Sequence, residues 1–381
     1  MLTKQPPETM DDTDYMQRAL DLAAKGIGWV EPNPAVGCVI VKDGRVIGEG
    51  FHERFGGPHA EINALADCRQ RGIDPAGAAM IVTLEPCCHV GKTGPCTEAV
   101  IAAGIAKVVI ATGDPFHQVA GGGIERLRNA GIDVETGPGR EQALVLNAPF
   151  FKYARTKRPW VIAKWAQSAD AFLASRRHRW ISCETSRRDV HRLRRRCQGI
   201  LVGVQTAIAD DPRLTVRIAD VAWERQPLRI ILDSTLRIPD DKRVLDTAEA
   251  ATLVVITSGT LQKQSRRVAA MAGRGVEILA VAENKGRCDL NQVLEQLGRR
   301  GIQQLLVEGG PAVLTDFLRQ DLVDEVRIYL APTELASEGA VRVTETMASF
   351  VKNPEQLLHG TTSNLDCDRC IAGLIHEPPG E

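Results

Sequence analysis

Short apolar runs alternate with segments of helical periodicity along the first half of the chain, and this alternation limits the fold more than any other feature. Strands that are separated by helices pack as an α/β layered sheet. Asp43-Gly44 between two apolar runs is typical of a hairpin turn. The spacing predicts helices over residues 14–26, 59–72 and 96–104, a hairpin over 35–52, and strands over 77–86 and 107–115.

The second half repeats this alternation. A chain of 381 residues is long enough for two domains, and we place the boundary so that residues 1–150 form the first and 151–381 the second. Strand-like runs are predicted over residues 159–168, 199–209, 228–234, 252–257, 276–281, 303–310 and 324–332, with helices over 186–196, 264–274 and 290–300.

The composition excludes several classes of binding partner. The formal net charge of −1 provides no overall field for nucleic acid or an anionic membrane, and no run approaches the ~20 apolar residues of a membrane span. The N-terminal residues lack the apolar core of a secretory signal. The 10 cysteines are too few for a disulfide scaffold, and we therefore expect a cytoplasmic protein in which clustered cysteines bind metal or act in catalysis.

The densest cluster of metal-binding residue types is "TLEPCCHVGKTGPC", which contains Cys87, Cys88, His89 and Cys96. Upstream, "GGPHAEINAL" places His59 at the start of a predicted helix. One histidine and two cysteines leave a fourth position open, which is the pattern of catalytic zinc. We predict His59, Cys87 and Cys96 as the ligands of Zn²⁺.

Glu61 follows His59 by two positions and is the predicted catalytic residue. Zinc lowers the pKa of bound water to around 7 and so provides hydroxide at neutral pH. A carboxylate beside the metal then transfers the proton of that water to a leaving amine. His-x-Glu followed by Pro-Cys and a second cysteine is typical of zinc-dependent nucleobase deaminases.

The spacing between the two cysteines departs from the usual Cys-x-x-Cys, because eight residues separate Cys87 from Cys96. Gly91, Gly94 and Pro95 break any helix there, so the chain can loop out and return. We expect Cys88 to be a small buried packing residue. His89 is left open as a substrate contact, a fourth ligand or a surface residue.

This loop, together with "PNPAVGCVIVKDGRVIGEGFH" and "HAEINAL", resembles the deaminase half of the bifunctional riboflavin biosynthesis proteins. These are diaminohydroxyphosphoribosylaminopyrimidine deaminases and 5-amino-6-(5-phosphoribosylamino)uracil reductases. The resemblance implies a cytidine-deaminase-like three-layer α/β/α domain. It also implies that Asn33 and His52 line the base pocket and that Lys92 and Thr93 bind the ribose 5-phosphate.

In the second half, "LVEGGPAVLTDFL" runs from a strand through glycines into a helix, a weak signal for a phosphate site. No Gly-x-Gly-x-x-Gly follows a strand, which argues against a standard Rossmann domain. "GILVGVQTAIADDPRLTVR" and "LVDEVRIYLAP" resemble the reductase half of the same family, which implies a dihydrofolate-reductase-like α/β domain that uses NADPH.

The resemblance also implies site residues for the reductase. Lys164 and Asp210 are candidates for proton delivery, since hydride transfer itself needs little beyond alignment of the reacting carbons. The implied cofactor contacts are Ala166, Trp180, Thr206, Asp210, Ser234 and Gly310, and the implied substrate contacts are His178, Arg194, Leu214, Arg217 and Glu308.

One segment of the reductase half departs from the family pattern, in which Ser/Thr-Leu-Asp-Gly precedes a loop of small residues. Here the sequence is Ser168-Ala169-Asp170-Ala171, and the following loop is basic and about two residues shorter. Alanine adopts positive φ only at a cost, so the reductase could be active or weakened. We expect it to be active.

The remaining cysteines, including "CDRC" at 367–370, are predicted to pack in ordinary cores. We therefore predict a bifunctional enzyme of riboflavin synthesis. It would deaminate 2,5-diamino-6-(5-phosphoribosylamino)pyrimidin-4(3H)-one and then reduce the ribosyl chain to ribityl. Its partner would be this small pyrimidine ribotide, without nucleic acid or membrane, and the protein would form a homo-oligomer. The alternatives are a deaminase of another base or nucleoside, an inactive reductase half, and a non-catalytic zinc-stabilised binding module.

Overall fold

The computed structural model describes residues 11–88, 94–116, 121–174, 180–218, 225–335 and 339–380. The chain divides into two compact units, one of residues up to 156 with 378–381 and one of residues 157–377. Residues 151–156, which we placed in the second domain, lie in a helix of the first unit. Within the described ranges, no helix combines the length and the apolar character needed to cross a membrane.

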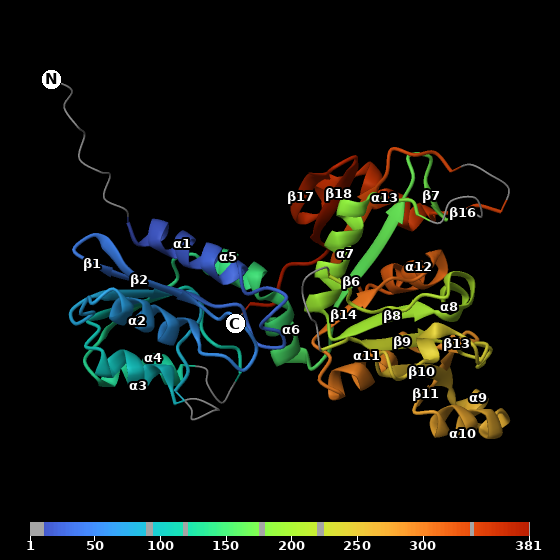
Figure 1. The fold of residues 1–381 in the computed structure, drawn as a ribbon, viewed down its shortest axis with the longest axis horizontal. Helices are drawn as coiled ribbons and strands as arrows, with labels where there is room; N and C mark the ends of the chain where they lie inside the picture. The colour runs from blue at the N-terminus through green and yellow to red at the C-terminus, as the bar shows by residue number, and fades with distance from the viewer. Residues whose placement is uncertain are drawn as a thin grey trace. The chain divides into compact units, whose positions relative to one another are not determined.

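The first unit is a three-layer α/β/α structure around a five-stranded sheet of order β2-β1-β3-β4-β5. Figure 1 shows α1 and α5 on one face of the sheet and α2, α3 and α4 on the other. The elements are β1 (Gly37–Lys42), β2 (Arg45–Phe51), β3 (Ala79–Val82), β4 (Lys107–Ile110), β5 (Asp133–Thr136), α1 (Asp12–Ala24), α2 (Ala60–Gln70), α3 (Cys96–Ala102), α4 (Gly122–Asn129), α5 (Arg140–Leu146) and α6 (Ala148–Thr156).

Successive residues of each strand point to opposite faces of the sheet. In β1, Cys38 and Ile40 belong to the core beneath α2, α3 and α4, whereas Val39 and Val41 belong to the core beneath α1. This period of two is what a strand buried on both faces requires. The hairpin between β1 and β2 turns at Asp43 and Gly44, both at positive φ, as predicted from their sequence.

The second unit is built on a nine-stranded sheet of order β11-β10-β9-β8-β14-β6-β15-β18-β17. Its strands are parallel from β11 to β15, and β18 and β17 extend it antiparallel. The strands are β6 (Trp160–Gln167), β7 (Phe172–Ala174), β8 (Gly199–Gly203), β9 (Leu228–Leu232), β10 (Thr252–Thr257), β11 (Glu277–Val281), β12 (Glu283–Asn284), β13 (Arg287–Cys288), β14 (Gln304–Val307), β15 (Glu325–Leu330), β16 (Val341–Arg342), β17 (Leu358–Leu365) and β18 (Asp368–Leu374).

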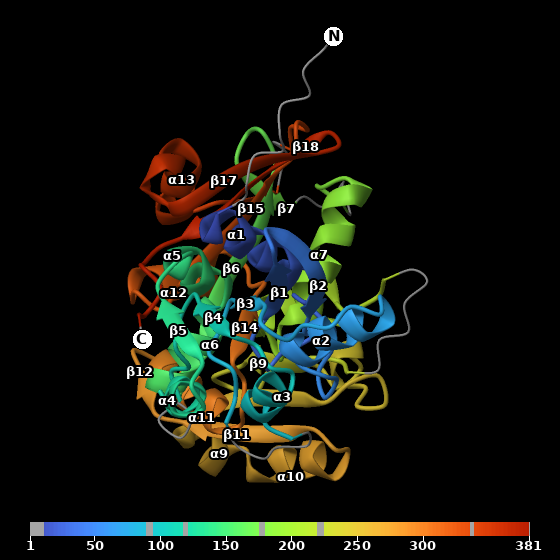
Figure 2. The same cartoon turned by 90° about the vertical axis from the view of Figure 1, so that its left-hand side faces the viewer.

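Helices cover both faces of this sheet, with α7 on one side and α11 and α12 on the other (Figure 2). Parallel strands bring their carboxyl ends to one edge, where α/β proteins bind ligands. The helices are α7 (Glu184–Arg196), α8 (Val204–Asp210), α9 (Ser258–Lys263), α10 (Ser265–Gly273), α11 (Leu290–Arg299), α12 (Pro311–Arg319) and α13 (Glu345–Lys352), with short 3-10 turns at Arg243–Leu245 and Pro354–Gln356.

One predicted strand is wrong over half of its length. Residues 199–209 were expected to form a single strand, but β8 ends at Gly203 and α8 begins at Val204. Gly203 has extended backbone angles and caps the helix, and Val204 and Ala207 then point into the core at helical spacing. An apolar run of this kind does not distinguish strand from buried helix by itself.

Candidate zinc and nucleotide sites

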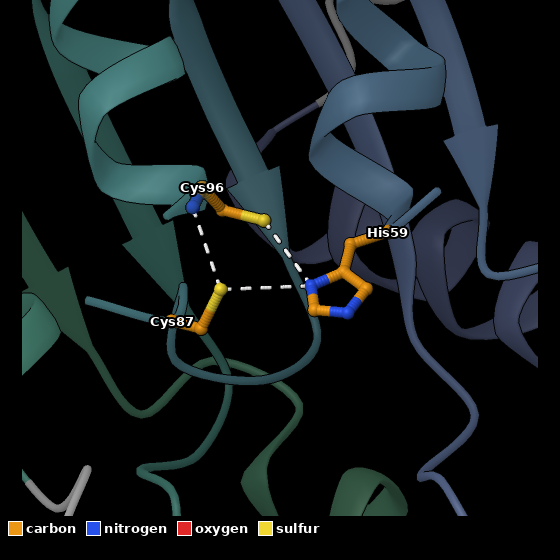
Figure 3. A group of neighbouring side chains, drawn as sticks. All are labelled: His59, Cys87 and Cys96. Carbon is orange, nitrogen blue, oxygen red and sulfur yellow. Dashed lines mark hydrogen bonds between the residues drawn. The ribbon is translucent and has the colours of Figure 1, made fainter. Parts of the chain in front are cut away.

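Three metal-binding side chains meet in the first unit. His59 precedes α2, Cys87 follows β3, and Cys96 is the first residue of α3 (Figure 3). The His59 Nδ1 atom lies 3.6 Å from Cys87 Sγ and 3.3 Å from Cys96 Sγ, and all three donor atoms lie within 4.8 Å of one another. One imidazole nitrogen and two sulfurs are the donors that zinc prefers, so the group fits Zn²⁺.

Two glycines explain how His59 reaches the cysteines. A Cβ at Gly50 would lie 2.3 Å from the Ala64 nitrogen, and one at Gly48 would lie 2.6 Å from the Ala64 oxygen. Because β2 carries no side chains at these positions, α2 packs directly on its backbone. This close approach holds the start of α2, and with it His59, beside the end of β3.

Backbone contacts fix the two cysteines relative to each other. The Cys96 N–H donates to Cys87 Sγ over 3.4 Å, and the Thr97 N–H donates to the Cys87 carbonyl over 3.2 Å. Without metal, the Cys96 thiol and the His59 ring lower the pKa of Cys87 against the effect of burial, whereas the same pairing raises the pKa of Cys96. The lowered pKa of Cys87 favours the thiolate form, which is the form that binds a metal.

Glu61 lies in the first turn of α2 and is only 3% exposed. Its carboxyl group is close enough to the Cys96 thiol for the two to influence each other's pKa. Burial raises the pKa of Glu61, and the neighbouring His59 opposes that shift. Among the described side chains, the group of donors within 4.8 Å of one another contains the histidine and both cysteines but not Glu61. This arrangement suits a proton carrier beside the metal rather than a ligand.

Asn33 and His52 are joined by a hydrogen bond beside this group. The Asn33 Nδ2 atom lies 3.2 Å from His52 Nε2, and His52 Nδ1 lies 2.9 Å from the Pro58 carbonyl. Because the carbonyl requires a donor, His52 carries its proton on Nδ1 and accepts from Asn33. Burial lowers the pKa of His52, which keeps this ring neutral. The rings of His52 and His59 stand 5.4 Å apart, edge to face.

Several expected contacts of this loop lie outside the described residues, namely His89, Lys92 and Thr93. Cys88 differs from the prediction, since it is partly exposed rather than buried. A Cβ at Gly122 would lie 3.0 Å from its sulfur. Cys88 thus lies against the start of α4, and it is not among the metal-donor group.

Glu85 is a residue that the sequence reasoning missed. Its buried carboxylate accepts backbone N–H groups of Asp114, Gly121, Gly123 and Ile124 at 2.8–3.1 Å. It therefore connects the end of β3 to the start of α4. The position of Glu85 in "TLEPCC" was a weak signal for this role. A charged residue directly after an apolar strand and before the metal ligands requires a partner.

In the second unit, Glu308 forms a buried group with two cations. Arg194 donates to it through Nε at 2.7 Å and Nη2 at 2.9 Å, and Lys164 Nζ lies 3.8 Å from it. Burial by itself would raise the pKa of Glu308. The neighbouring cations Arg194 and Lys164 outweigh burial and lower the pKa to about 2. Burial also lowers the pKa of Lys164. The sequence had assigned these three residues to the same site, and the structure brings them together.

A second set of predicted residues surrounds this group. The Arg217 N–H donates to His191 Nδ1 at 3.1 Å, and its guanidinium donates to Thr215 Oγ1 at 3.0 Å. Leu214 is buried in a left-handed backbone conformation at φ 53°. His191, which was not predicted, has its pKa lowered to about 4 by burial and then by Arg194 and Arg217. In the sequence, the signal that could have identified His191 was its position within "VHRLR".

The glycines at the carboxyl ends of β8 and β14 form a tight junction. The Gly310 N–H donates to Thr206 Oγ1 at 3.0 Å. A Cβ at Gly309 would lie 2.8 Å from Val313 Cβ, and one at Gly203 would lie 2.7 Å from Val313 Cγ2. Only glycines allow α12 to start this close to the sheet. This glycine junction before a helix of nine residues is the candidate site for a diphosphate such as that of NADPH.

The other predicted cofactor contacts differ in their exposure and in the groups that they contact. Ser234 follows β9, and its hydroxyl accepts from the Cys288 N–H at 3.0 Å. Ala166 lies in β6, and Asp210 is exposed at the end of α8. Trp180 is 58% exposed, with the Arg187 guanidinium 5.2 Å from its ring. His178 lies outside the described residues.

Ala171 does adopt the conformation that was expected to be costly, at φ 66°. The Ala171 N–H donates to the Ser168 carbonyl, and the Ser168 N–H donates to the Phe172 carbonyl, which closes a three-residue hairpin loop. Asp170 braces the loop by accepting from the Leu335 N–H. The turn that the family pattern forms with glycine is therefore kept with alanine.

Two family models match the chain. The cytidine and deoxycytidylate deaminase zinc-binding region matches residues 9–112, and the RibD C-terminal domain matches residues 159–355.

Curated relatives match over most of their length. The riboflavin biosynthesis protein RibD of Aquifex aeolicus is 44% identical over 330 residues, which are 86% of this chain and 88% of the relative. RibD of Escherichia coli is 41% identical over 342 residues, 87% and 90% of the two chains.

Solved structures agree with this likeness. Acinetobacter baumannii RibD has a TM-score of 0.77 at 36% identity and covers 95% of this chain and 98% of its own. A deaminase/reductase from Thermotoga maritima has a TM-score of 0.75 at 36% identity and covers 95% and 97%. The predicted two-domain α/β architecture is thereby confirmed.

Proposed function

The chain belongs to the RibD family, and from this premise we propose which residues carry out its two reactions and on which substrate. It is an enzyme of riboflavin biosynthesis with a zinc-binding deaminase domain and an NADPH-dependent reductase domain. The proposed substrate is 2,5-diamino-6-(5-phosphoribosylamino)pyrimidin-4(3H)-one. Deamination replaces an amino group with oxygen from water and releases ammonia. Reduction then converts the ribosyl chain to ribityl.

The observation that carries the deaminase assignment is the group of His59, Cys87 and Cys96 with the buried Glu61 beside it. When bound to these donors, zinc supplies Lewis acidity, which lowers the pKa of water at the site. Glu61 takes the proton of the attacking water and delivers it to the departing amine. Its raised pKa suits both halves of this transfer, because the carboxyl must hold the proton between the two events.

Asn33 and the neutral His52 orient the pyrimidine. The fixed tautomer of His52 leaves the Asn33 carboxamide oxygen as an acceptor for the base. Lys92 and Thr93 are proposed to bind the 5-phosphate.

For the reductase, NADPH supplies the hydride. Thr206, Ser234 and the Gly310 junction hold the cofactor, with Ala166, Trp180 and Asp210 as further contacts. The anionic Glu308 holds Arg194 and Lys164 in place for the phosphoribosyl group. The Lys164 ammonium, whose pKa is lowered by burial, delivers the proton that accompanies hydride transfer. His178, Leu214 and Arg217 complete the substrate site.

The proposal also includes a cytoplasmic homo-oligomer. The ten cysteines are all free thiols, which supports a reducing compartment. Light scattering on the purified chain tests the oligomeric state.

One assay tests both reactions. The zinc-loaded protein receives the diaminopyrimidinone ribotide and NADPH, and ammonia release and NADPH oxidation are followed separately. Ammonia together with NADPH oxidation is the expected result. No ammonia contradicts the deaminase assignment, and ammonia without NADPH oxidation contradicts the reductase assignment.

A further inference from the structure

A second group of metal-binding side chains lies in the reductase unit, at the turn between β17 and β18. It consists of Cys183, Cys367 and Asp368, whose donor atoms lie within 4.8 Å of one another. The two sulfurs come from parts of the chain 184 residues apart, so the fold rather than a local motif brings them together.

Asp368 anchors the group. It is 1% exposed, and its Oδ2 atom accepts from the Cys183 N–H at 2.8 Å and the Ser186 hydroxyl at 2.7 Å. Its Oδ1 atom faces Cys367 Sγ at 3.6 Å. None of the ion pairs among the described residues includes Asp368. A buried carboxylate without a cationic partner is costly, and a bound cation would neutralise it.

The two thiols differ in access. Cys183 lies at the start of α7, with its sulfur 3.1 Å from the Leu365 carbonyl. Cys367 is exposed at the tip of the β17–β18 turn. The group is therefore closed on the protein side and open to solvent on the other. A cation can enter directly, and water can complete its coordination.

The Cys-x-x-Cys spacing at Cys367 and Cys370 is not what forms this group. Cys370 is buried in β18 and packs with Val190 and Tyr329 beneath α7. Cys367, which was predicted to be an ordinary packing residue, is exposed instead, and Cys183 is partly exposed.

We propose that Cys183, Cys367 and Asp368 bind a soft divalent cation of the Zn²⁺ class. Two sulfurs and one carboxylate oxygen are a donor set that selects zinc over magnesium or calcium. On binding, both S–H bonds break, two protons pass to solvent, and two metal–sulfur bonds form without electron transfer. The cation would tie the β17–β18 turn to the start of α7, the helix that carries Arg194.

The test counts zinc in the full-length protein. After loading and removal of free metal, wild type is expected to hold about two zinc ions per chain, and Cys367→Ser about one. Cys370→Ala, in the adjoining strand β18, is the control and should keep about two. Since Cys367 is exposed, its replacement does not disturb the core. Cys183→Ser should give the same loss as Cys367→Ser.

A second measurement uses alkylation of Cys367. Zinc should slow its reaction with iodoacetamide by about tenfold, because the metal-bound thiolate is protected, and Cys183→Ser should remove this protection. About one zinc in wild type, or an unchanged alkylation rate, overturns the proposal. A disulfide between Cys183 and Cys367 formed by a peroxide, without zinc binding, also overturns it. Zinc counting does not depend on either activity, so this outcome is separate from the ammonia and NADPH assay.

Discussion

His59 and Glu61 are close in sequence but are proposed to take different roles. His59 precedes α2 with extended backbone angles, so its ring points to the cysteines. Glu61 lies in the first turn of the helix, where burial raises its pKa. The residue type and the spacing predicted these roles, and the close packing of α2 on β2 provides the geometry.

Replacing Glu61 by Gln should lower ammonia release by about 10²–10⁴-fold, because general acid–base transfer contributes this much. Zinc content should stay unchanged, since the donor group does not include Glu61. Ammonia production and bound zinc are measured on the same samples. If zinc is lost together with activity, Glu61 is a ligand and its proposed role is wrong.

The positive φ of Ala171 has a cost in conformational free energy that a single substitution can remove. A left-handed alanine costs about 1–2 kcal/mol, whereas glycine costs roughly 0.5–1 kcal/mol in unfolded-chain entropy. Ala171→Gly should therefore stabilise the reductase unit by about 0.5–1 kcal/mol, measured by urea unfolding. Ala169→Gly, in the same turn but without positive φ, is the matched control and should destabilise the unit. Equal effects of both substitutions would contradict this explanation.

At the scale of elements, Glu85 joins β3 to α4. Four N–H groups point at one carboxylate, and a carboxamide can accept at only one of its two ends. Glu85→Gln should destabilise the deaminase unit by about 1–3 kcal/mol, because buried donors lose their acceptor. Thermal unfolding measures the loss. Glu98→Gln, in an exposed ion pair with Arg126, is the control and should leave the thermal unfolding essentially unchanged.

The junction between β14 and α12 depends on the absence of a side chain. Gly309→Ala places a Cβ against Val313, so α12 must shift away from the sheet. We expect the KM for NADPH to rise by about tenfold, which corresponds to about 1.4 kcal/mol. Adding Val313→Ala should restore most of the affinity, and Gly259→Ala, which has open space around it, should change nothing. Failure of the second substitution to restore affinity would sink the packing explanation.

For the whole molecule, the proposed zinc donors and the glycine junction proposed to bind NADPH belong to different units of the chain. Chelation should therefore abolish ammonia release but leave NADPH oxidation within about twofold when the deaminated pyrimidine is supplied. The experiment is best done on Cys367→Ser, which removes the second proposed site. Parallel loss of both activities would show that the zinc site supports the reductase as well.

The sequence alone determined the layered α/β class and the two-domain organisation, and it predicted His59, Cys87, Cys96 and Glu61 as one site, of which the first three meet in the structure. These follow from local information, since side-chain periodicity reports which face is buried and donor types report which metal fits. The same information predicted the β1–β2 hairpin, because Asp-Gly adopts the required positive φ angles. It misjudged residues 204–209, where a short apolar run fits either a strand or a buried helix.

The long-range contacts between side chains were decided only by the tertiary structure. The four bonds to Glu85 and the meeting of Cys183 with Cys367 and Asp368 depend on chain paths that close over long separations. Such contacts are set by strand register and by how closely helices approach the sheet. Glycines at positions such as Gly50 and Gly309 permit that approach, but a glycine in the sequence does not reveal which backbone comes near it.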